Sequence, residues 1–135
     1  MTNNDNDLFW WGSVTFRITH PNIDPSDISD RINVALQDTD IPGKLEVTCG
    51  HEWNKTFWFG KYRIESPCRP DVLIAWVESF ADSNKPQIAD LMALGCKMYV
   101  YVGIHAKVLC VGFDLPATPT LWELNIPIGI EFFSS

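Results

Sequence analysis

Short stretches in which apolar and polar residues alternate, separated by stretches of helical spacing, restrict the fold most strongly. Between Ser13 and His20, the apolar residues Val14, Phe16 and Ile18 alternate with polar ones. This alternation predicts a strand that buries one face. Because helical stretches lie between the strands, we expect an α+β domain.

A proline stands at or near the start of each predicted helix. Asp24-Pro25 supplies an N-cap and a first helical residue, and the apolar spacing then continues to about Gln37. Pro70 opens a second helix, Pro86 lies early in a third, and Thr118-Pro119 starts a short fourth one. These positions predict four helices.

Five further strands follow from alternation or short apolar runs: Leu45–Cys49, Thr56–Glu65, Lys97–Ile104, Val108–Leu115 and Ile128–Phe132. The expected order is β-α-β-β-α-α-β-β-α-β, as a mostly antiparallel sheet with helices packed on one face. Thr15–Ile28 and Val111–Leu121 each run from a strand through a proline turn into a capped helix. This similarity indicates a pseudo-duplication of two halves.

The length of 135 residues suits one domain, which we place at residues 10–135, after a loose or disordered N-terminus at residues 1–9. That N-terminus is polar and acidic, unlike a secretion signal. The longest apolar run is far shorter than the ~20 residues that span a membrane. We therefore expect a cytoplasmic protein without membrane contact, whose four cysteines stay reduced.

The chain is acidic, with a formal net charge of −7. Binding to a nucleic-acid backbone requires clustered Lys and Arg, and the sequence shows no such cluster. We therefore expect no nucleic-acid backbone binding. An acidic chain suits a basic protein partner, because opposite charges steer the two together.

Several motifs resemble the bacterial family catalogued as domain of unknown function 4279. Residues 13–18 and 23–28 resemble its opening, and Tyr62–Ser66 resembles its aromatic strand before the central helix. Further similar segments are Leu94-Gly95, Met98–Val102, Phe113–Leu115, Leu121–Leu124 and Ile128–Phe133. The resemblance covers roughly residues 12–133 and implies an α+β sheet-and-helix domain. It implies no catalytic residues.

No catalytic, metal or cofactor site is predicted. Cys49 and His51 are two residues apart, but alternation with Leu45 and Val47 places the thiol on the buried face, where it would be inert. The cysteine and histidine spacing matches no zinc site. The glycines are scattered, which argues against a phosphate-binding loop.

Aromatic and cationic residues form the candidate binding set: Trp10, Trp11, Arg17, His51, Trp53, Trp58 and Arg63. The adjacent Trp10 and Trp11 point to opposite faces of a strand, so one of them is hard to bury. Trp53 lies in a predicted turn. Arg17 and Arg63 project from polar strand faces, where they could pair with a carboxylate or a phosphate.

The leading hypothesis is a non-enzymatic binding protein of immunity or inhibitor type, which engages another protein through an exposed aromatic and acidic surface. The alternative is a module that binds a small planar, nucleotide-like ligand between Trp53, Trp58 and Arg63. A third hypothesis is a hydrolase that uses His51 or His20. The aromatic patch could also be the face of a homodimer.

Overall fold

The computed structural model describes residues 9–37, 44–64, 69–106 and 115–134, which form a single α+β domain. Its strands are β1 (Phe9–His20), β2 (Lys44–Glu52), β3 (Lys55–Ile64), β4 (Lys97–Ala106) and β5 (Ile128–Ser134). Its helices are α1 (Pro25–Gln37), α2 (Pro70–Ser83), α3 (Lys85–Ala93) and α4 (Pro119–Glu123). The predicted α+β class is therefore confirmed.

One open sheet has the strand order β2-β3-β1-β4-β5. The neighbouring strands pair antiparallel everywhere except between β4 and β5, which run parallel. A parallel pair needs a long crossover connection, and the chain between β4 and β5 contains α4. The sheet is thus mostly antiparallel, as predicted.

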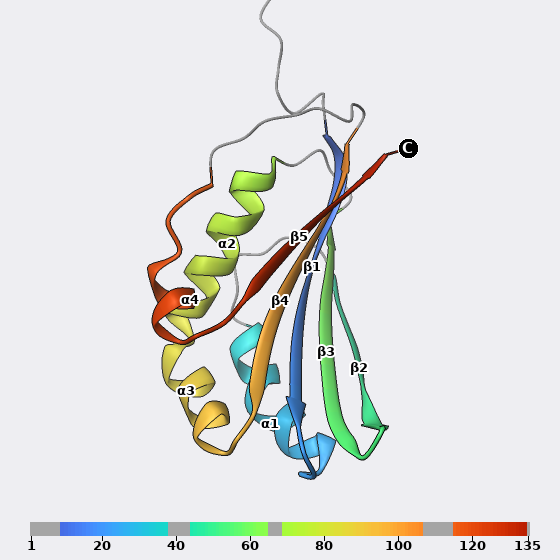
Figure 1. The fold of residues 1–135 in the computed structure, drawn as a ribbon, viewed down its shortest axis with the longest axis vertical. Helices are drawn as coiled ribbons and strands as arrows, with labels where there is room; N and C mark the ends of the chain where they lie inside the picture. Colours follow the sequence, from blue (N-terminus) through green and yellow to red (C-terminus); the bar gives the residue numbers. More distant parts are fainter. Residues whose placement is uncertain (1–8, 38–43, 65–68, 107–114, 135) are drawn as a thin grey trace, which may run out of the picture.

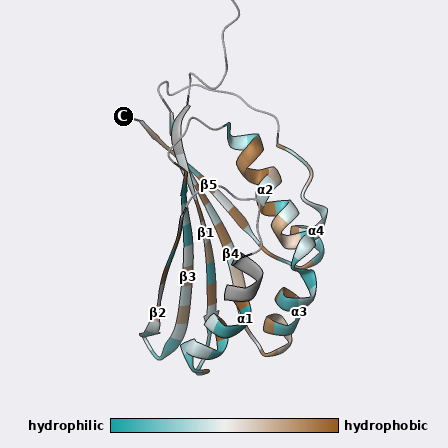
Figure 2. Ribbon diagram, turned by 180° about the vertical axis from the view of Figure 1, so that it is seen from behind, coloured by the Kyte–Doolittle hydropathy of each residue, from teal (hydrophilic) through white to brown (hydrophobic). Residues whose placement is uncertain are grey.

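All four helices of the described residues lie on one face of the sheet (Figure 1). In Figure 2 the strands show alternating brown and teal bands, as expected for a sheet with one buried face. Phe16 of β1 and Phe80 of α2 meet in the core with their ring centroids 4.5 Å apart. Helices α1 and α3 add Ile28, Ile32, Ile88 and Leu91 to the same core.

The prolines expected at the helix starts locate the helices correctly. Pro25, Pro70 and Pro119 are each the first residue of a helix, and α1 ends at Gln37 as predicted. Gly95 follows α3 with φ at +95°, a conformation that glycine adopts without strain. Local sequence signals therefore fix these boundaries.

The strand boundaries differ more from the prediction. β1 starts at Phe9, inside the segment expected to be loose, while residues 1–8 lie outside the described residues. β2 continues to Glu52, so the turn expected at residues 50–55 is only Trp53-Asn54. The predicted strand Val108–Leu115 falls almost entirely outside the described residues. The pseudo-duplication depends on that segment and stays a prediction.

The two helix starts expected to be capped alike are capped differently. Asp24 Oδ1 accepts a 3.0 Å hydrogen bond from the Ser26 backbone N–H, which is the expected local cap of α1. Thr118 makes no side-chain cap of α4. Instead, the Glu78 carboxylate of α2 accepts the backbone N–H groups of Thr120 and Leu121, at 2.6 and 3.2 Å.

The burial predicted for Cys49 is wrong. Cys49 pairs with Trp58 of β3 and lies on the helix side of the sheet, as the alternation implied. However, β2 is an edge strand, and Figure 1 places it farthest from α2, α3 and α4. Val47 is therefore 41% exposed and Cys49 is exposed as well. Alternation gives the face of a residue but not whether a helix covers it.

No helix among the described residues is long and apolar enough to cross a membrane.

Candidate functional site

The face of the sheet opposite the helices is the most distinctive surface of the described structure. We call it the open face and define it by the residues that the ladder register places together. They are Ser13, Thr15, Arg17 and Thr19 of β1, Phe57, Phe59, Lys61 and Arg63 of β3, and Lys97, Tyr99, Tyr101, Gly103 and His105 of β4. The flanking strands add Glu46 and Thr48 of β2 and Gly129, Glu131 and Phe133 of β5.

Arg17 stands at the centre of the open face, between two aromatic strands. Its backbone pairs with Phe59 on one side and with Tyr99 on the other. Its guanidinium carbon lies 5.5 Å from the ring centroid of Phe59 and 5.1 Å from that of Tyr101. These cation–π contacts hold the guanidinium over the rings, and its five N–H groups can donate to an anion.

Further rings continue the aromatic surface on both sides of Arg17. The Phe57 and Phe59 centroids are 5.0 Å apart on β3. At the other end of the face, His105 stacks on Phe133 with centroids 5.0 Å apart and planes 21° apart. Phe57 and Phe59 are half-buried. A row of rings on this side of a sheet is unusual, because polar residues normally occupy the solvent side.

Tyr99 lies across the neighbouring strand because residue 129 has no side chain. A Cβ atom at Gly129 would lie 1.9 Å from the Tyr99 hydroxyl oxygen, a distance that would force the ring to move. Tyr99 also borders a shallow hollow of about 550 Å³ on the open face. The hollow is lined by Arg17, Thr19, Phe59, Lys97, Met98, Tyr99 and Pro127. Its size matches that of ordinary small-ligand sites.

The charge of the open face is opposite to that of the whole chain. The sheet brings together four cations, Arg17, Lys61, Arg63 and Lys97, against two acidic residues, Glu46 and Glu131. The chain as a whole carries −7. Strand pairing therefore places on one face cations that are far apart along the chain, an arrangement that the sequence does not show.

The cations of the open face are free of ion pairs within the described residues. The ion pairs found there join Arg69 to Asp71 and Lys85 to Glu123, in the helical layer. Cross-strand partners of Arg17 and Lys97 are aromatic or hydroxyl residues rather than carboxylates. Lys61, by contrast, lies opposite Glu46 in the β2–β3 ladder. Arg17 and Lys97 are thus the cations best placed to meet an anionic partner.

The structure separates the predicted binding residues. Arg17 and Arg63 are exposed on the open face, as predicted. Trp58 is fully buried among the helices, and its indole N–H lies 3.3 Å from the Ser29 hydroxyl. Because Trp58 and Arg63 point to opposite faces of β3, the proposed sandwich of Trp53, Trp58 and Arg63 cannot form.

The side chains of Trp10 and Trp11 lie outside the described part of the structure. Their backbone belongs to β1, where Trp11 pairs with His105. The ladder is irregular between Phe9 and Trp11, and such an irregularity changes which face a side chain takes. The expected exposure of one of these tryptophans stays a prediction.

His51 and Trp53 come together at the β2–β3 turn, at one end of the sheet. Trp53 and Asn54 have φ values of 54° and 60°, and Trp53 is 88% exposed. A hollow of about 480 Å³ beside them is lined by Pro21, Asn22, His51, Glu52, Trp53 and Asn54. His51 Nδ1 lies 3.3 Å from the Thr56 hydroxyl. His51 also contributes to lowering the pKa of Asp24, although the backbone N–H of Ser26 is the main cause.

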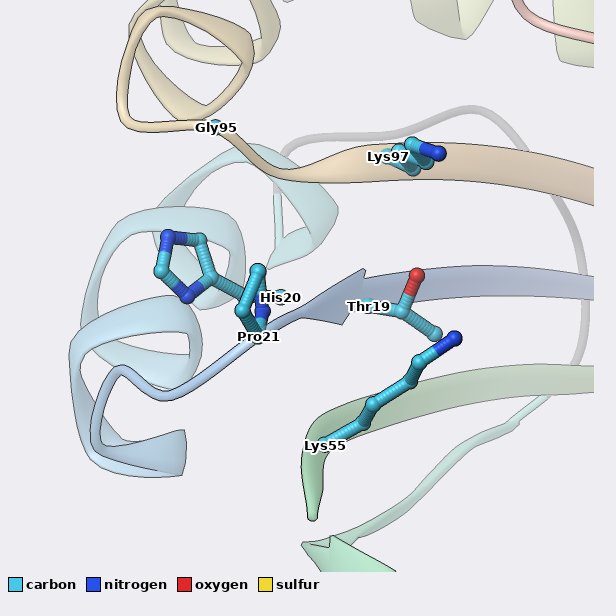
Figure 3. Close-up of a pocket in the computed structure, with 6 residues that line it drawn as sticks. All are labelled: Thr19, His20, Pro21, Lys55, Gly95 and Lys97. Carbon is cyan, nitrogen blue, oxygen red and sulfur yellow. The ribbon is translucent and has the colours of Figure 1, made fainter. Parts of the chain in front are cut away.

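His20, the second histidine considered for catalysis, has a structural role. Its Nδ1 accepts the backbone N–H groups of Asn22 and Ile23, both at 3.0 Å, so its Nε2 carries the proton and donates to the Leu94 carbonyl at 2.8 Å. Figure 3 shows its ring turned away from Lys55 and Lys97. With both nitrogens occupied, the imidazole has no free atom with which to act as a base.

The open face also contains aromatic residues that were not among the predicted binding residues. Phe57, Phe59, Tyr99 and Tyr101 were assigned to strands without a binding role, because two-sided apolar strands are read as buried. Their spacing of two residues in each strand was the available signal, since it puts each pair on one face.

The candidate metal ligands and nucleophile form no cluster within the described part of the chain. The described residues contain no group of three or more His, Cys, Asp or Glu side chains that could hold a metal ion. Cys49 and His51 lie on the same side of β2, and no hydrogen bond joins them. The arrangement offers cations and rings rather than a reactive pair.

No protein-family model matches the chain, and no curated protein matches it. Among solved structures, the de novo designed protein Foldit4 is similar with a TM-score of 0.49 and 12% identity, covering 68% of this chain and 94% of its own. A second is the Bacillus subtilis YXEP protein, a dinuclear metal binding peptidase from the M20 family. That likeness has a TM-score of 0.41 and 12% identity, covering 95% of this chain and 42% of the peptidase. Likenesses this weak carry no argument about function.

Proposed function

We propose that this chain is a non-enzymatic binding protein whose open sheet face takes an anionic partner. The observation that carries the proposal is the placement of Arg17, which is held over the rings of Phe59 and Tyr101 without an acidic partner among the described residues. A cation framed by uncovered rings recognises a group that is both negatively charged and apolar or planar.

The surroundings of Arg17 support binding rather than a chemical reaction. The hollow beside it is shallow and holds cations, hydroxyls and rings. It lacks an acid–base pair, since no carboxylate or histidine lines it. A surface of this kind can hold and orient a partner.

A second candidate function is the one expected from the sequence, binding to a basic protein partner. It is favoured by two exposed indoles outside the open face, Trp53 at 88% and Trp122 at 84% exposure. Trp53 follows Glu52 in the sequence, and Trp122 precedes Glu123. Exposed tryptophans beside acidic residues are suitable anchors for a basic surface.

A pull-down from a lysate of the native cell, read by native mass spectrometry, tests both functions with matched variants. The double variant Phe59→Ser/Tyr99→Ser removes rings from the open face, whereas Trp53→Ser and Trp122→Ser remove the two exposed indoles. We expect a component that the wild type and both tryptophan variants retain and the open-face variant loses.

Loss of that component from a tryptophan variant instead would support the second candidate and contradict the first. Circular dichroism of each variant must show the wild-type fold. Serine replaces half-buried rings in the open-face variant and exposed rings in the two tryptophan variants, so the fold of the open-face variant is the one to check most closely.

A further inference from the structure

We propose that the anionic partner of the open face is a single-stranded nucleic acid, an inference that rests on the proposed function of that face. Single strands are bound by combining cations, which contact phosphates, with aromatic rings, on which the bases stack. A β-sheet that displays rings on adjacent strands is one established way to present both. The open face has these two components on adjacent strands.

The spacing of the rings suits successive bases. Phe57 and Phe59 are two residues apart on β3, and so are Tyr99 and Tyr101 on β4. Positions two apart in a strand are about 6.6 Å apart along the backbone. The Phe57 and Phe59 rings lean together to a centroid distance of 5.0 Å, so they form one continuous platform for a base. Tyr99 lies across Gly129, so the ring rests on bare backbone.

The cations lie beside the rings at the same level of the sheet. Arg17 is flanked by Phe59 and Tyr99 in the ladder, and Lys97 pairs with Thr19 one step further along. A backbone that crosses from β3 to β4 would pass both charges while its bases meet the rings. The hydroxyls of Thr15 and Thr19 lie between these strands and can bond to base edges.

The acidic remainder of the chain does not prevent this binding. Among the described residues, most of the negative charge lies away from the open face, because only Glu46, Glu52 and Glu131 belong to strands and the other acidic residues belong to the helices or their starts. Charges on the far side of a helix layer are screened at physiological salt, where the Debye length is about 8 Å. The negative side would instead orient a nucleic acid toward the cationic face.

Fluorescence anisotropy of a labelled oligothymidylate of about 12 nucleotides, within the known range of single-strand sites, tests the inference. We expect saturable binding by the full chain that weakens with salt. Contacts from three cations give a slope of about −2 for log K against log salt. A duplex of the same length should bind less well, because its bases are not free to stack.

The variants test whether the rings and cations act as proposed. Phe59→Ala and Tyr99→Ala should each weaken binding by about 5- to 100-fold, the range of one lost base–aromatic stack. Arg17→Gln should weaken it and reduce the salt slope by about 0.7. The matched controls are Trp122→Ala, an exposed ring on α4, and Lys85→Gln, a cation of α3, and both should bind like the wild type.

Three results would overturn the inference. One is no rise in anisotropy up to ~100 µM protein at low salt, the weak limit of non-specific binding. Another is binding that Phe59→Ala and Tyr99→Ala leave unchanged. The third is a dimer in sedimentation that Arg17→Glu dissociates, because a second copy would then cover the face.

A labelled polyglutamate separates this inference from the proposed function. If polyglutamate binds in an Arg17-dependent manner and the oligonucleotide does not, the partner is an acidic protein and the proposed function stands. If neither probe binds to the open face, both proposals fail.

Discussion

At the scale of single residues, the open face depends on positions where a small change alters the surface without touching the core. Gly129 is one of them, because any side chain there would meet the Tyr99 hydroxyl. Arg17 is another, since its ladder neighbours are aromatic. By contrast, Tyr62 of β3 points into the core and is 3% exposed.

Burial raises the pKa of Tyr62 from 10.0 to about 12. Between pH 10 and 12 the unfolded chain therefore loses the Tyr62 proton while the folded chain keeps it. The free energy of unfolding falls as pH rises through this window, because the unfolded state binds fewer protons. A difference of one pKa unit between the folded and unfolded states corresponds to about 1.4 kcal/mol, so the free energy of unfolding should fall by about 2–3 kcal/mol across the window.

Urea unfolding of wild type and Tyr62→Phe at several pH values from 9 to 12 measures this effect. Lysines titrate in the same window, and the comparison removes their contribution because both proteins share them. The wild type should lose more stability than Tyr62→Phe across the window. Parallel curves for the two proteins would show that Tyr62 ionises in the folded state as it does when unfolded.

At the scale of helices and strands, some features follow from sequence and others do not. Pro25, Pro70 and Pro119 give the helix starts correctly because proline acts through its own backbone geometry. The burial of Cys49 was mispredicted because coverage by a helix is a property of the assembled layers. The alternation of apolar and polar residues within a strand does not tell whether a helix covers that strand.

The candidate site shows the same division. Arg17 and Arg63 were placed on a polar face correctly, because alternation within one strand is sufficient for that. The cluster around Arg17 was missed, because it joins β1, β3 and β4 through a register that no single strand encodes. Trp58 was misassigned because its strand is aromatic on both faces, and only the packed helices show which face is the core.

The cap of α4 by Glu78 is a contact between elements that yields a stability prediction. Glu78 bonds two backbone N–H groups at the start of α4, so Glu78→Ala should leave both without that acceptor. We expect a loss of about 1–2 kcal/mol in unfolding free energy, the usual cost of a lost cap. Glu123→Ala, which removes an exposed ion pair with Lys85, is the matched control and should cost less than about 1 kcal/mol.

Chemical denaturation of the two variants beside the wild type measures the difference. Equal losses would mean that the carboxylate bonds of Glu78 add nothing beyond a surface charge. The stability loss of Glu78→Gln should lie between those of Glu78→Ala and Glu123→Ala, since an amide oxygen can still accept one of the N–H groups.

At the scale of the whole molecule, the fold separates two surfaces of different character. The helices cover one face of the sheet and leave the other to solvent within the described residues (Figure 1). The uncovered face has more cations than carboxylates although the chain carries −7. Net charge alone therefore does not describe this face, because the sheet concentrates the minority charge on one side.

If a partner binds to the open face, the backbone amides of its strands should respond to that partner. In a titration of the ¹⁵N-labelled chain with the oligothymidylate, we expect chemical-shift changes concentrated at the outward positions of β1, β3 and β4, around Arg17, Phe59 and Tyr99. Changes concentrated in α2 to α4 or at the Trp53 turn, with the amides of the open face unchanged, would show that the partner binds elsewhere.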